Sequence, residues 1–259
     1  MTEKHILQLN HVSLTYHTLR GETLALKDIS FGIQPGEFIS IVGPSGCGKT
    51  TILSLIAGLL NKTSGDIYLQ NDPITKTNKN VGYMFQRDEL FDWLTIEENI
   101  LLGLTIQKKR TPENKKKAQE LIVKYGLDGF QKSYPRELSG GMRQRVALIR
   151  TLATNPHLLL LDEPFSALDY QTRLNVQNSM HAIIKSEHKT AILVTHDISE
   201  AVAMSDRVLI LTKRPATLKK EITISLPQNL TPFERRNHPE FQTYFLKIWE
   251  ELQDEEENS

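Results

Sequence analysis

The sequence predicts an α/β fold with an antiparallel β section at its N-terminus and a helical section inserted into its core. Three observations predict it. The first 40 residues alternate apolar and polar positions, which is typical of paired strands. The run GEFISIVG leads into a glycine loop and then a helix, the order of a phosphate-binding site. Strands and helices alternate again from Leu158, after a stretch of about 87–157 that has helical patterning.

Composition excludes several classes of protein. The chain has 259 residues, enough for one large domain or two modest ones. Lys+Arg and Asp+Glu both number 31, so the formal net charge is zero and we expect no nucleic-acid partner. A single Cys excludes an internal disulfide framework and suits a reducing compartment. The start MTEKHILQLN lacks a secretory pattern, and no apolar run approaches the roughly 18 residues of a membrane span, so we expect neither secretion nor membrane crossing.

The N-terminal elements follow from this patterning. ILQLNHVSLTY and LALKDISFGI predict two strands joined by a polar hairpin at Thr18–Glu22. GEFISIVG, Gly36–Gly43, is apolar enough for a strand buried on both faces. TILSLIAGLL then predicts a helix, and DIYLQ and VGYMF predict two further short strands.

The inserted section is predicted to hold three helices. WLTIEENILLGL and PENKKKAQELIVKYGL are amphipathic, and Pro112 suits the first turn of the second. LSGGMRQRVALIRTLAT predicts the third, with Ser139 as its N-cap. The basic run KKRTPENKKK could bind an anionic partner, but a solvated helix start is favoured because no aromatic residues are interleaved.

The last third returns to alternating elements. LLLLD, AILVT and RVLILT predict strands, with helices from about Gln171 and over ISEAVAM. The tail after Ser225 contains three prolines and ends in a predicted helix, FQTYFLKIWEEL.

The strongest chemical signal is GPSGCGKT, which fits G-x-x-x-x-G-K-[ST] between a predicted strand and a predicted helix. Glycines let backbone N–H groups turn toward phosphate oxygens, and the following helix adds its positive N-terminal dipole. Lys49 would supply a point charge to the β- and γ-phosphates, and the Thr50 hydroxyl would coordinate Mg²⁺.

The second signal is HLLLLDEP, a buried strand that ends in Asp162 and Glu163. Open α/β sheets bind ligands at the carboxyl ends of their strands. We therefore expect Asp162 to hold Mg²⁺ through water and Glu163 to orient and deprotonate the attacking water. The alternative is an acidic N-cap for the next turn.

The third signal is LSGGM, where Ser139, Gly140 and Gly141 open a helix and form a second candidate anion site. The phosphate loop already provides a binding site for one triphosphate in each chain. The simplest interpretation is therefore that the second anion site faces the nucleotide bound by a second copy of the chain. An ordinary Ser-capped helix is the alternative.

GPSGCGKT, LSGGM, LLLLDEP, SALD at Ser166–Asp169 and THD at Thr195–Asp197 occur in this order, and together they resemble the ATP-binding subunit of ABC transporters. The chain is more narrowly similar to nitrate/sulfonate/taurine-type importer ATPases, through RDELFDWLTIEENI, SYPRELSGGMRQR and KRPATLKKEITISLP. The resemblance implies a P-loop NTPase (RecA-like) core and an ATPase that drives import as a nucleotide-sandwich dimer. Exporter or lipoprotein-release ATPases and soluble ABC ATPases of DNA repair or translation are the alternatives.

The resemblance also assigns roles at matching positions. Tyr16 would stack on adenine, unless it is only a strand-face tyrosine, and Thr51 would contact the α-phosphate. Gln86 would act in catalysis as the glutamine loop that senses Mg²⁺ and water, and His196 as the switch histidine at the γ-phosphate. Asp169 would cross the dimer interface, and a helix N-cap role is compatible with that.

The motifs and the resemblance together imply three sets of residues. Nucleotide contacts would come from Tyr16, Gly43, Pro44, Ser45, Gly46, Cys47, Gly48, Lys49, Thr50, Thr51, Ser139, Gly140, Gly141 and Asp169; catalysis from Glu163, His196 and Gln86; Mg²⁺ ligation from Thr50, Gln86 and Asp162. ATP and Mg²⁺ are the expected cofactors. Residues 1–229 would form the nucleotide-binding domain, with the helical subdomain at about 87–157, and 230–259 a C-terminal helical extension.

The same resemblance implies the partners. A second copy and integral membrane permease subunits would bind directly, and an extracytoplasmic solute-binding protein indirectly, at the cytoplasmic face of the cell membrane. Leu90, Phe91, Trp93 and Leu94 are the candidate permease-docking cluster, unless Trp93 packs inside the insert. Cys47 is either a reactive thiol in the phosphate loop or a buried, inert one.

Overall fold

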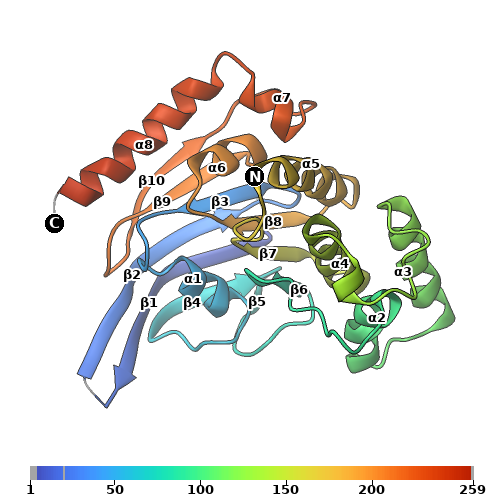
Figure 1. Ribbon diagram of the computed structural model, residues 1–259. Coiled ribbons are helices and arrows are strands. Elements are labelled where there is room, and N and C mark those ends of the chain that lie inside the picture. The colour runs from blue at the N-terminus through green and yellow to red at the C-terminus, as the bar shows by residue number, and fades with distance from the viewer. Residues whose placement is uncertain (1–4, 20, 258–259) are drawn as a thin grey trace.

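The computed structural model describes residues 5–19 and 21–257, and within them the chain forms two sheets flanked by helices (Figure 1). The strands are β1 Leu7–Thr18, β2 Gly21–Ile33, β3 Phe38–Val42, β4 Ser64–Leu69, β5 Asp72–Pro73, β6 Val81–Met84, β7 Leu158–Asp162, β8 Thr190–Val194, β9 Arg207–Leu211 and β10 Leu218–Thr223. The helices are α1 Lys49–Ile56, α2 Ile96–Ile106, α3 Pro112–Lys124, the 3₁₀ turn η1 Pro135–Glu137, α4 Gly140–Ala153, α5 Tyr170–Ser186, α6 Ile198–Met204, α7 Pro232–Arg236 and α8 Phe241–Glu257.

The predicted N-terminal hairpin is present. β1 and β2 pair antiparallel, with Thr18 opposite Gly21, and β4 and β5 extend the sheet in the order β2-β1-β4-β5. Arg20, inside the predicted turn, lies outside the described residues. Leu7 and Leu9 are buried because alternate positions of β1 face the core, and Val12 is buried beyond a register shift that separates it from Leu9.

The central sheet has the order β10-β9-β3-β8-β7-β6, parallel except for the β9–β10 pair. Every residue of β3, β7 and β8 is buried, as their continuous apolar runs predict. One face packs on α1 and the N-terminal sheet, and the other packs on α4 and α5. The leucines of β7 divide between these two cores: Leu158 and Leu160 face α1, whereas Leu159 and Leu161 face α4 and α5.

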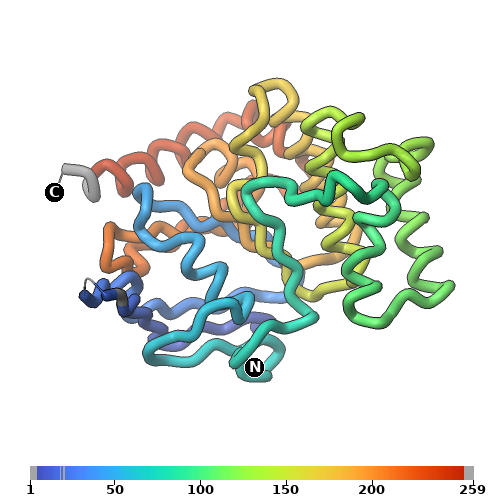
Figure 2. Tube along the Cα trace, turned by 60° about the horizontal axis from the view of Figure 1, so that its bottom comes forward, coloured from blue at the N-terminus to red at the C-terminus, as the bar shows by residue number. Residues whose placement is uncertain are grey.

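The inserted section, α2 to α4, has its own apolar cluster and packs on the main core through α4 and α5. It lies at the opposite end of the molecule from the C-terminal end of α8 in both views (Figures 1 and 2). Thr95 and Glu98 form a capping box at the start of α2, so this helix begins three residues after Trp93, where we predicted its start. Pro112 and Ser139 take their predicted helix-start positions.

The C-terminal segment packs against the core through α6. Phe241 and Ile248 of α8 join a buried cluster with residues of α6 and β9. Sequence analysis did not predict β10, an edge strand whose LKKEIT sequence is too polar for a clear strand pattern. The 229/230 domain boundary stays a prediction, and residues 258–259 lie outside the described part. Among the described residues, no helix combines the length and apolar character that crossing a bilayer requires.

Candidate functional site

The phosphate loop joins the end of β3 to the start of α1 and wraps around Lys49. Gly46 and Gly48 have φ angles of 70° and 127°, which residues other than glycine rarely adopt. The Lys49 ammonium donates to the carbonyl oxygens of Gly43 at 2.8 Å and Pro44 at 3.0 Å. Lys49 is largely buried at the N-terminus of a helix, and within the part of the chain that the structure describes its ammonium forms no ion pair with a carboxylate, an arrangement suited to an anion.

Thr50 and Asp162, two of the three predicted metal ligands, lie together. The Thr50 hydroxyl donates to Asp162 Oδ1 at 3.0 Å, and the Tyr83 hydroxyl donates to Asp162 Oδ2 at 3.0 Å. Burial raises the pKa of Asp162, while the Tyr83 and Thr50 hydrogen bonds lower it. We predicted VGYMF as a strand but did not predict the contact of Tyr83 with Asp162, because it depends on the pairing of β6 with β7.

Tyr16 lies beside the phosphate-loop helix, although it comes from the N-terminal sheet. Its hydroxyl is 3.2 Å from the Thr51 hydroxyl, and its ring packs at the edge of the buried cluster beneath α1. The structure thus brings Tyr16 and Thr51, two of the predicted nucleotide contacts, together at the first turn of α1.

Two side chains converge on the carboxylate of Glu163, and a third, Ser166, contacts its backbone carbonyl. His196 Nδ1 lies 3.1 Å from Glu163 Oε2, and Gln86 Nε2 donates to the same oxygen at 3.4 Å. Gln86 also donates to Ser166 Oγ at 3.3 Å, and that hydroxyl donates to the Glu163 carbonyl oxygen at 3.0 Å. Glu163 itself has a φ of 45°, an uncommon conformation that is held by its N–H bond to the Val194 carbonyl.

The topology explains this convergence. Gln86, Glu163 and His196 follow β6, β7 and β8, and the phosphate loop follows β3. These four strands are neighbours and parallel, so their carboxyl ends meet at one edge of the sheet.

Ser139, Gly140, Gly141 and Asp169 lie in a separate group at two helix starts. Ser139 Oγ accepts from the Met142 N–H and caps α4, and Asp169 caps α5 through the Thr172 N–H. Within the described residues, neither side chain is hydrogen-bonded to the phosphate loop. A Cβ at Gly141 would lie 2.9 Å from Val176, so this glycine also serves the close packing of α4 on α5.

The loop that begins at Gln86 is tied to α4. Arg143 Nε donates to the Asp88 carboxylate at 3.0 Å, and the Arg150 guanidinium donates to the carbonyl oxygens of Asp88 and Glu89. These charge-assisted bonds connect the residues around Glu163 with the helix that Ser139 caps. Sequence analysis did not identify them, because no motif pairs residues so far apart in the chain.

Cys47 is buried, with 1% of its surface exposed, and burial raises the pKa of its thiol. The inert interpretation is therefore favoured.

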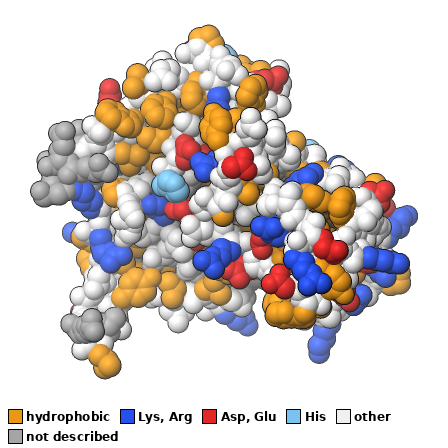
Figure 3. All heavy atoms as spheres, viewed as in Figure 1, with side chains coloured by type: hydrophobic (Ala, Val, Ile, Leu, Met, Phe, Trp, Pro, Cys, Tyr) orange, Lys and Arg blue, Asp and Glu red, His pale blue; other side chains and the backbone are white. Residues whose placement is uncertain are grey.

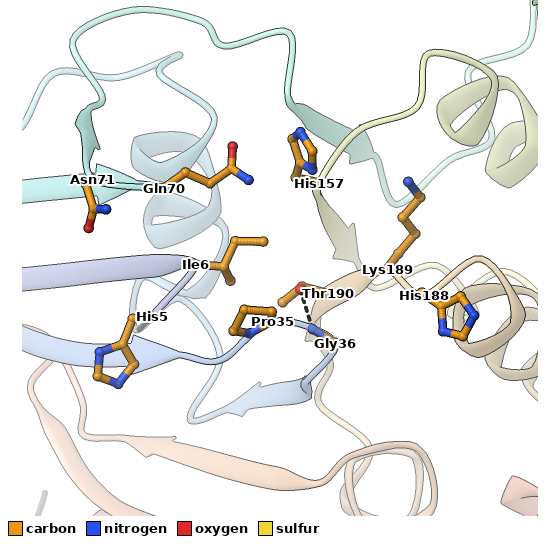
Figure 4. A pocket seen from close by; sticks show the side chains of 10 residues that line it. All are labelled: His5, Ile6, Pro35, Gly36, Gln70, Asn71, His157, His188, Lys189 and Thr190. Carbon is orange, nitrogen blue, oxygen red and sulfur yellow. Dashed lines mark hydrogen bonds between the residues drawn. The ribbon is translucent and has the colours of Figure 1, made fainter. Parts of the chain in front are cut away.

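A hollow of about 400 Å³ lies at the other edge of the sheet (Figure 4). Among the residues that line it, Pro35 lies in the segment before β3, Lys189 directly precedes β8, and Thr190 is the first residue of β8. Because it is at the amino ends of the strands, it is separate from the phosphate loop.

A family model described as ABC transporter matches residues 26–166, a span that includes the phosphate loop, Gln86, LSGGM and Glu163. The chain belongs to the ABC transporter family. It is 50% identical over 249 residues to the uncharacterized ABC transporter ATP-binding protein YtlC of Bacillus subtilis, covering 95% of each chain.

Two further relatives are informative. The aliphatic sulfonates import ATP-binding protein SsuB of Bacillus cereus is 41% identical over 248 residues, covering 95% of this chain and 96% of that one. A dimeric post-hydrolysis structure of the ATP-binding cassette MJ0796, bound to ADP and Pi, matches with a TM-score of 0.72 and 33% identity over 85% of this chain and 100% of that one. The protein is an ATP-binding, ATP-hydrolysing subunit with the expected P-loop fold.

Proposed function

We propose that this protein energises solute import: two copies enclose two ATP molecules and transmit the energy of hydrolysis to integral membrane permease subunits at the cytoplasmic face of the cell membrane. An extracytoplasmic solute-binding protein would deliver the solute, as an indirect partner. The observation that carries the catalytic part is the Glu163 carboxylate, placed between Gln86 and His196 at the same sheet edge as the phosphate loop.

The loop residues fit a magnesium nucleotide. Among residues 5–19 and 21–257, no carboxylate forms an ion pair with Lys49, and its ammonium can turn from the Gly43 and Pro44 carbonyls to the β- and γ-phosphates. Thr50 and Asp162 offer one hydroxyl and one carboxylate, the sparse set that suits Mg²⁺ when phosphates and water complete its shell. When bound, the ion would neutralise the phosphate charge, and Gln86, which follows β6 at the same sheet edge, would be its third protein ligand. The ring of Tyr16 would stack on adenine, Thr51 would contact the α-phosphate, and the loop residues 43–48 would contribute backbone N–H groups.

Hydrolysis then needs a group that orients water and accepts its proton. Glu163 lies immediately after Asp162, the last residue of β7; its side chain is 23% exposed, and two neighbours hold its Oε2 atom. His196 would hold that carboxylate and reach the γ-phosphate, and the Gln86 amide would orient the same water.

The second copy explains the separate group at α4 and α5. Its Ser139 hydroxyl and the N–H groups of Gly140 and Gly141 would face the γ-phosphate bound by the other chain, and Asp169 would cross between the chains. The dimeric MJ0796 cassette supports this assembly.

Permease docking is proposed for the surface around Trp93. Its ring is 73% exposed and tilted against Phe91 at a centroid distance of 5.0 Å, so it is not part of the helical core. Asp88 and Glu89, just before this surface, are held by α4, which gives a mechanical route from the permease to Ser139. Basic and acidic side chains are interspersed over the helical section (Figure 3), and Lys115 and Lys117 of the basic run pair with Glu97 and Glu113, as a solvated helix start requires.

The test separates binding from chemistry. Glu163→Gln keeps the shape of the side chain but removes the base, so hydrolysis should fall by about 10²–10⁴-fold while ATP still binds. Lys49→Ala should weaken ATP binding itself, measured by equilibrium titration with a fluorescent nucleotide. Full turnover by Glu163→Gln, or unchanged affinity in Lys49→Ala, would contradict the assignments.

A further inference from the structure

A buried chain of hydrogen bonds leads away from His196. Thr195, the residue before it, donates from Oγ1 to Glu200 Oε2 at 2.6 Å and accepts from the Asp197 N–H at 3.0 Å. The backbone on both sides of His196 is therefore fixed to a carboxylate on α6 that is itself buried.

The chain continues to the C-terminal extension. Gln177 Nε2, on α5, donates to Glu200 Oε1 at 2.8 Å, and Arg236 Nη2, on α7, donates to Gln177 Oε1 at 2.5 Å. α7 lies against α5 and α6 (Figure 1). An unbroken path of side chains thus joins residue 236 to the loop that carries His196.

The donor and acceptor roles along this path are fixed. A guanidinium can only donate, so Arg236 holds the Gln177 oxygen and turns its NH₂ group toward Glu200. Glu200 then has one oxygen for Gln177 and the other for Thr195. Loss of Arg236 frees the amide to rotate, and loss of Gln177 leaves one buried oxygen of Glu200 without this donor.

We propose that Glu200, Gln177 and Arg236 are positioning residues for ATP hydrolysis, which hold the Thr195–Asp197 loop so that His196 stays against Glu163, and that the C-terminal extension thereby sets the turnover rate. The inference rests on the proposed roles of Glu163 and His196. It adds a function for the extension, residues 230–259, whose contacts with the core otherwise suggest only packing.

None of the three residues touches the phosphate loop through a hydrogen bond in the described part of the chain, so nucleotide affinity is not expected to change. Burial raises the pKa of Glu200, and the Thr195 hydroxyl and the guanidinium groups of Arg173 and Arg236 oppose that rise. Arg173 also donates to the Leu168 carbonyl just before Asp169, so the same carboxylate neighbours the segment proposed to cross the dimer.

The experiment compares full-length Arg236→Met, Arg236→Lys, Gln177→Met and the double variant Arg236→Met/Gln177→Met. Steady-state ATPase assays give kcat and KM for MgATP, and thermal unfolding gives the midpoint of each variant. Both methionine variants should lower kcat about 10- to 150-fold, the effect of one hydrogen bond to a charged group, with KM within about twofold of wild type. Arg236→Lys retains a donor and should recover most of the rate.

Phe233→Ala is the matched control, since Phe233 lies on the same helix, is 49% exposed and is outside the path. It should leave kcat unchanged. The double variant should be no slower than Gln177→Met alone, because Arg236 acts through Gln177.

Three results would overturn the proposal. The first is a wild-type kcat in folded Arg236→Met and Gln177→Met, and the second is an additive loss of kcat in the double variant. The third is a fall in kcat that only follows changes in KM and in the unfolding midpoint. The proposal would also be overturned if Arg236→Met and Arg236→Lys were both unfolded, because the role of Arg236 would then be structural. Glu163→Gln, assayed alongside, distinguishes the two failures: if it is active, the proposed catalytic centre is wrong; if it is inactive while Gln177→Met is normal, only the positioning path is wrong.

Discussion

Replacement of Trp93 by Ala separates a docking role from a packing role. Truncation of a buried Trp costs about 3–5 kcal/mol. Trp93 is 73% exposed, so only about a quarter of that loss applies, or about 1 kcal/mol, and its contact with Phe91 adds about 1 kcal/mol. The isolated subunit should therefore stay folded and keep its basal ATPase rate.

Binding to the permease should respond much more strongly. An aromatic anchor in a partner's cleft contributes about 2 kcal/mol or more, which corresponds to about a 30-fold loss of affinity. Co-purification with the permease and solute uptake in vesicles should both fall. Ile106→Ala is the matched control, because Ile106 is also 73% exposed in the same helical section but lies at the far end of α2. An unfolded Trp93→Ala subunit would refute the surface assignment, and normal uptake with normal stability would refute docking at Trp93.

Two further predictions concern buried titratable groups. Because burial raises the pKa of the Cys47 thiol, its maleimide labelling should stay slow at pH 7 and accelerate only above the usual thiol range, and Cys47→Ser should retain ATPase activity; rapid labelling at pH 7 would contradict the buried placement. Burial, with the nearby charges of Arg235 and Lys185, lowers the pKa of His181 to about 4. Between about pH 4 and 6.5, the unfolded chain therefore binds more protons at this histidine than the folded chain does. As the pH falls from 7 to 5, the free energy of unfolding of the protein should decrease by about 2 kcal/mol, because His181 stays neutral in the folded state. His181→Phe, which keeps a ring against Phe38, should remove that part of the pH dependence in urea unfolding; an unchanged slope would exclude His181 as its source.

Local patterns predicted most of the elements and the phosphate site. ISEAVAM forms α6 as expected, and Ser139 caps α4, because capping and helical periodicity depend on residues close in sequence. The sequence predicted that Gln86, Glu163 and His196 each follow a strand, and the family resemblance implied that all three act at the nucleotide, but the strand order that brings them together was not predicted.

Long-range polar contacts could not be predicted in this way. Asp88 and Arg143, or Gln177 and Glu200, belong to no short motif, and only the packing of separate helices brings them within hydrogen-bond distance. Tyr83 was missed for the same reason, since its partner Asp162 lies on a neighbouring strand.

The central claim is that two copies of this chain enclose ATP between them. Light scattering of Glu163→Gln with and without MgATP tests it most directly, with Ser139→Arg added to the same background as the comparison. The account predicts a monomer that doubles in mass on addition of ATP, two nucleotides per dimer, and no ATP-dependent dimer when Ser139 is replaced by Arg, although that monomer still binds ATP. A protein that stays monomeric with ATP, and whose wild-type form hydrolyses it at a specific rate independent of protein concentration, would contradict the account.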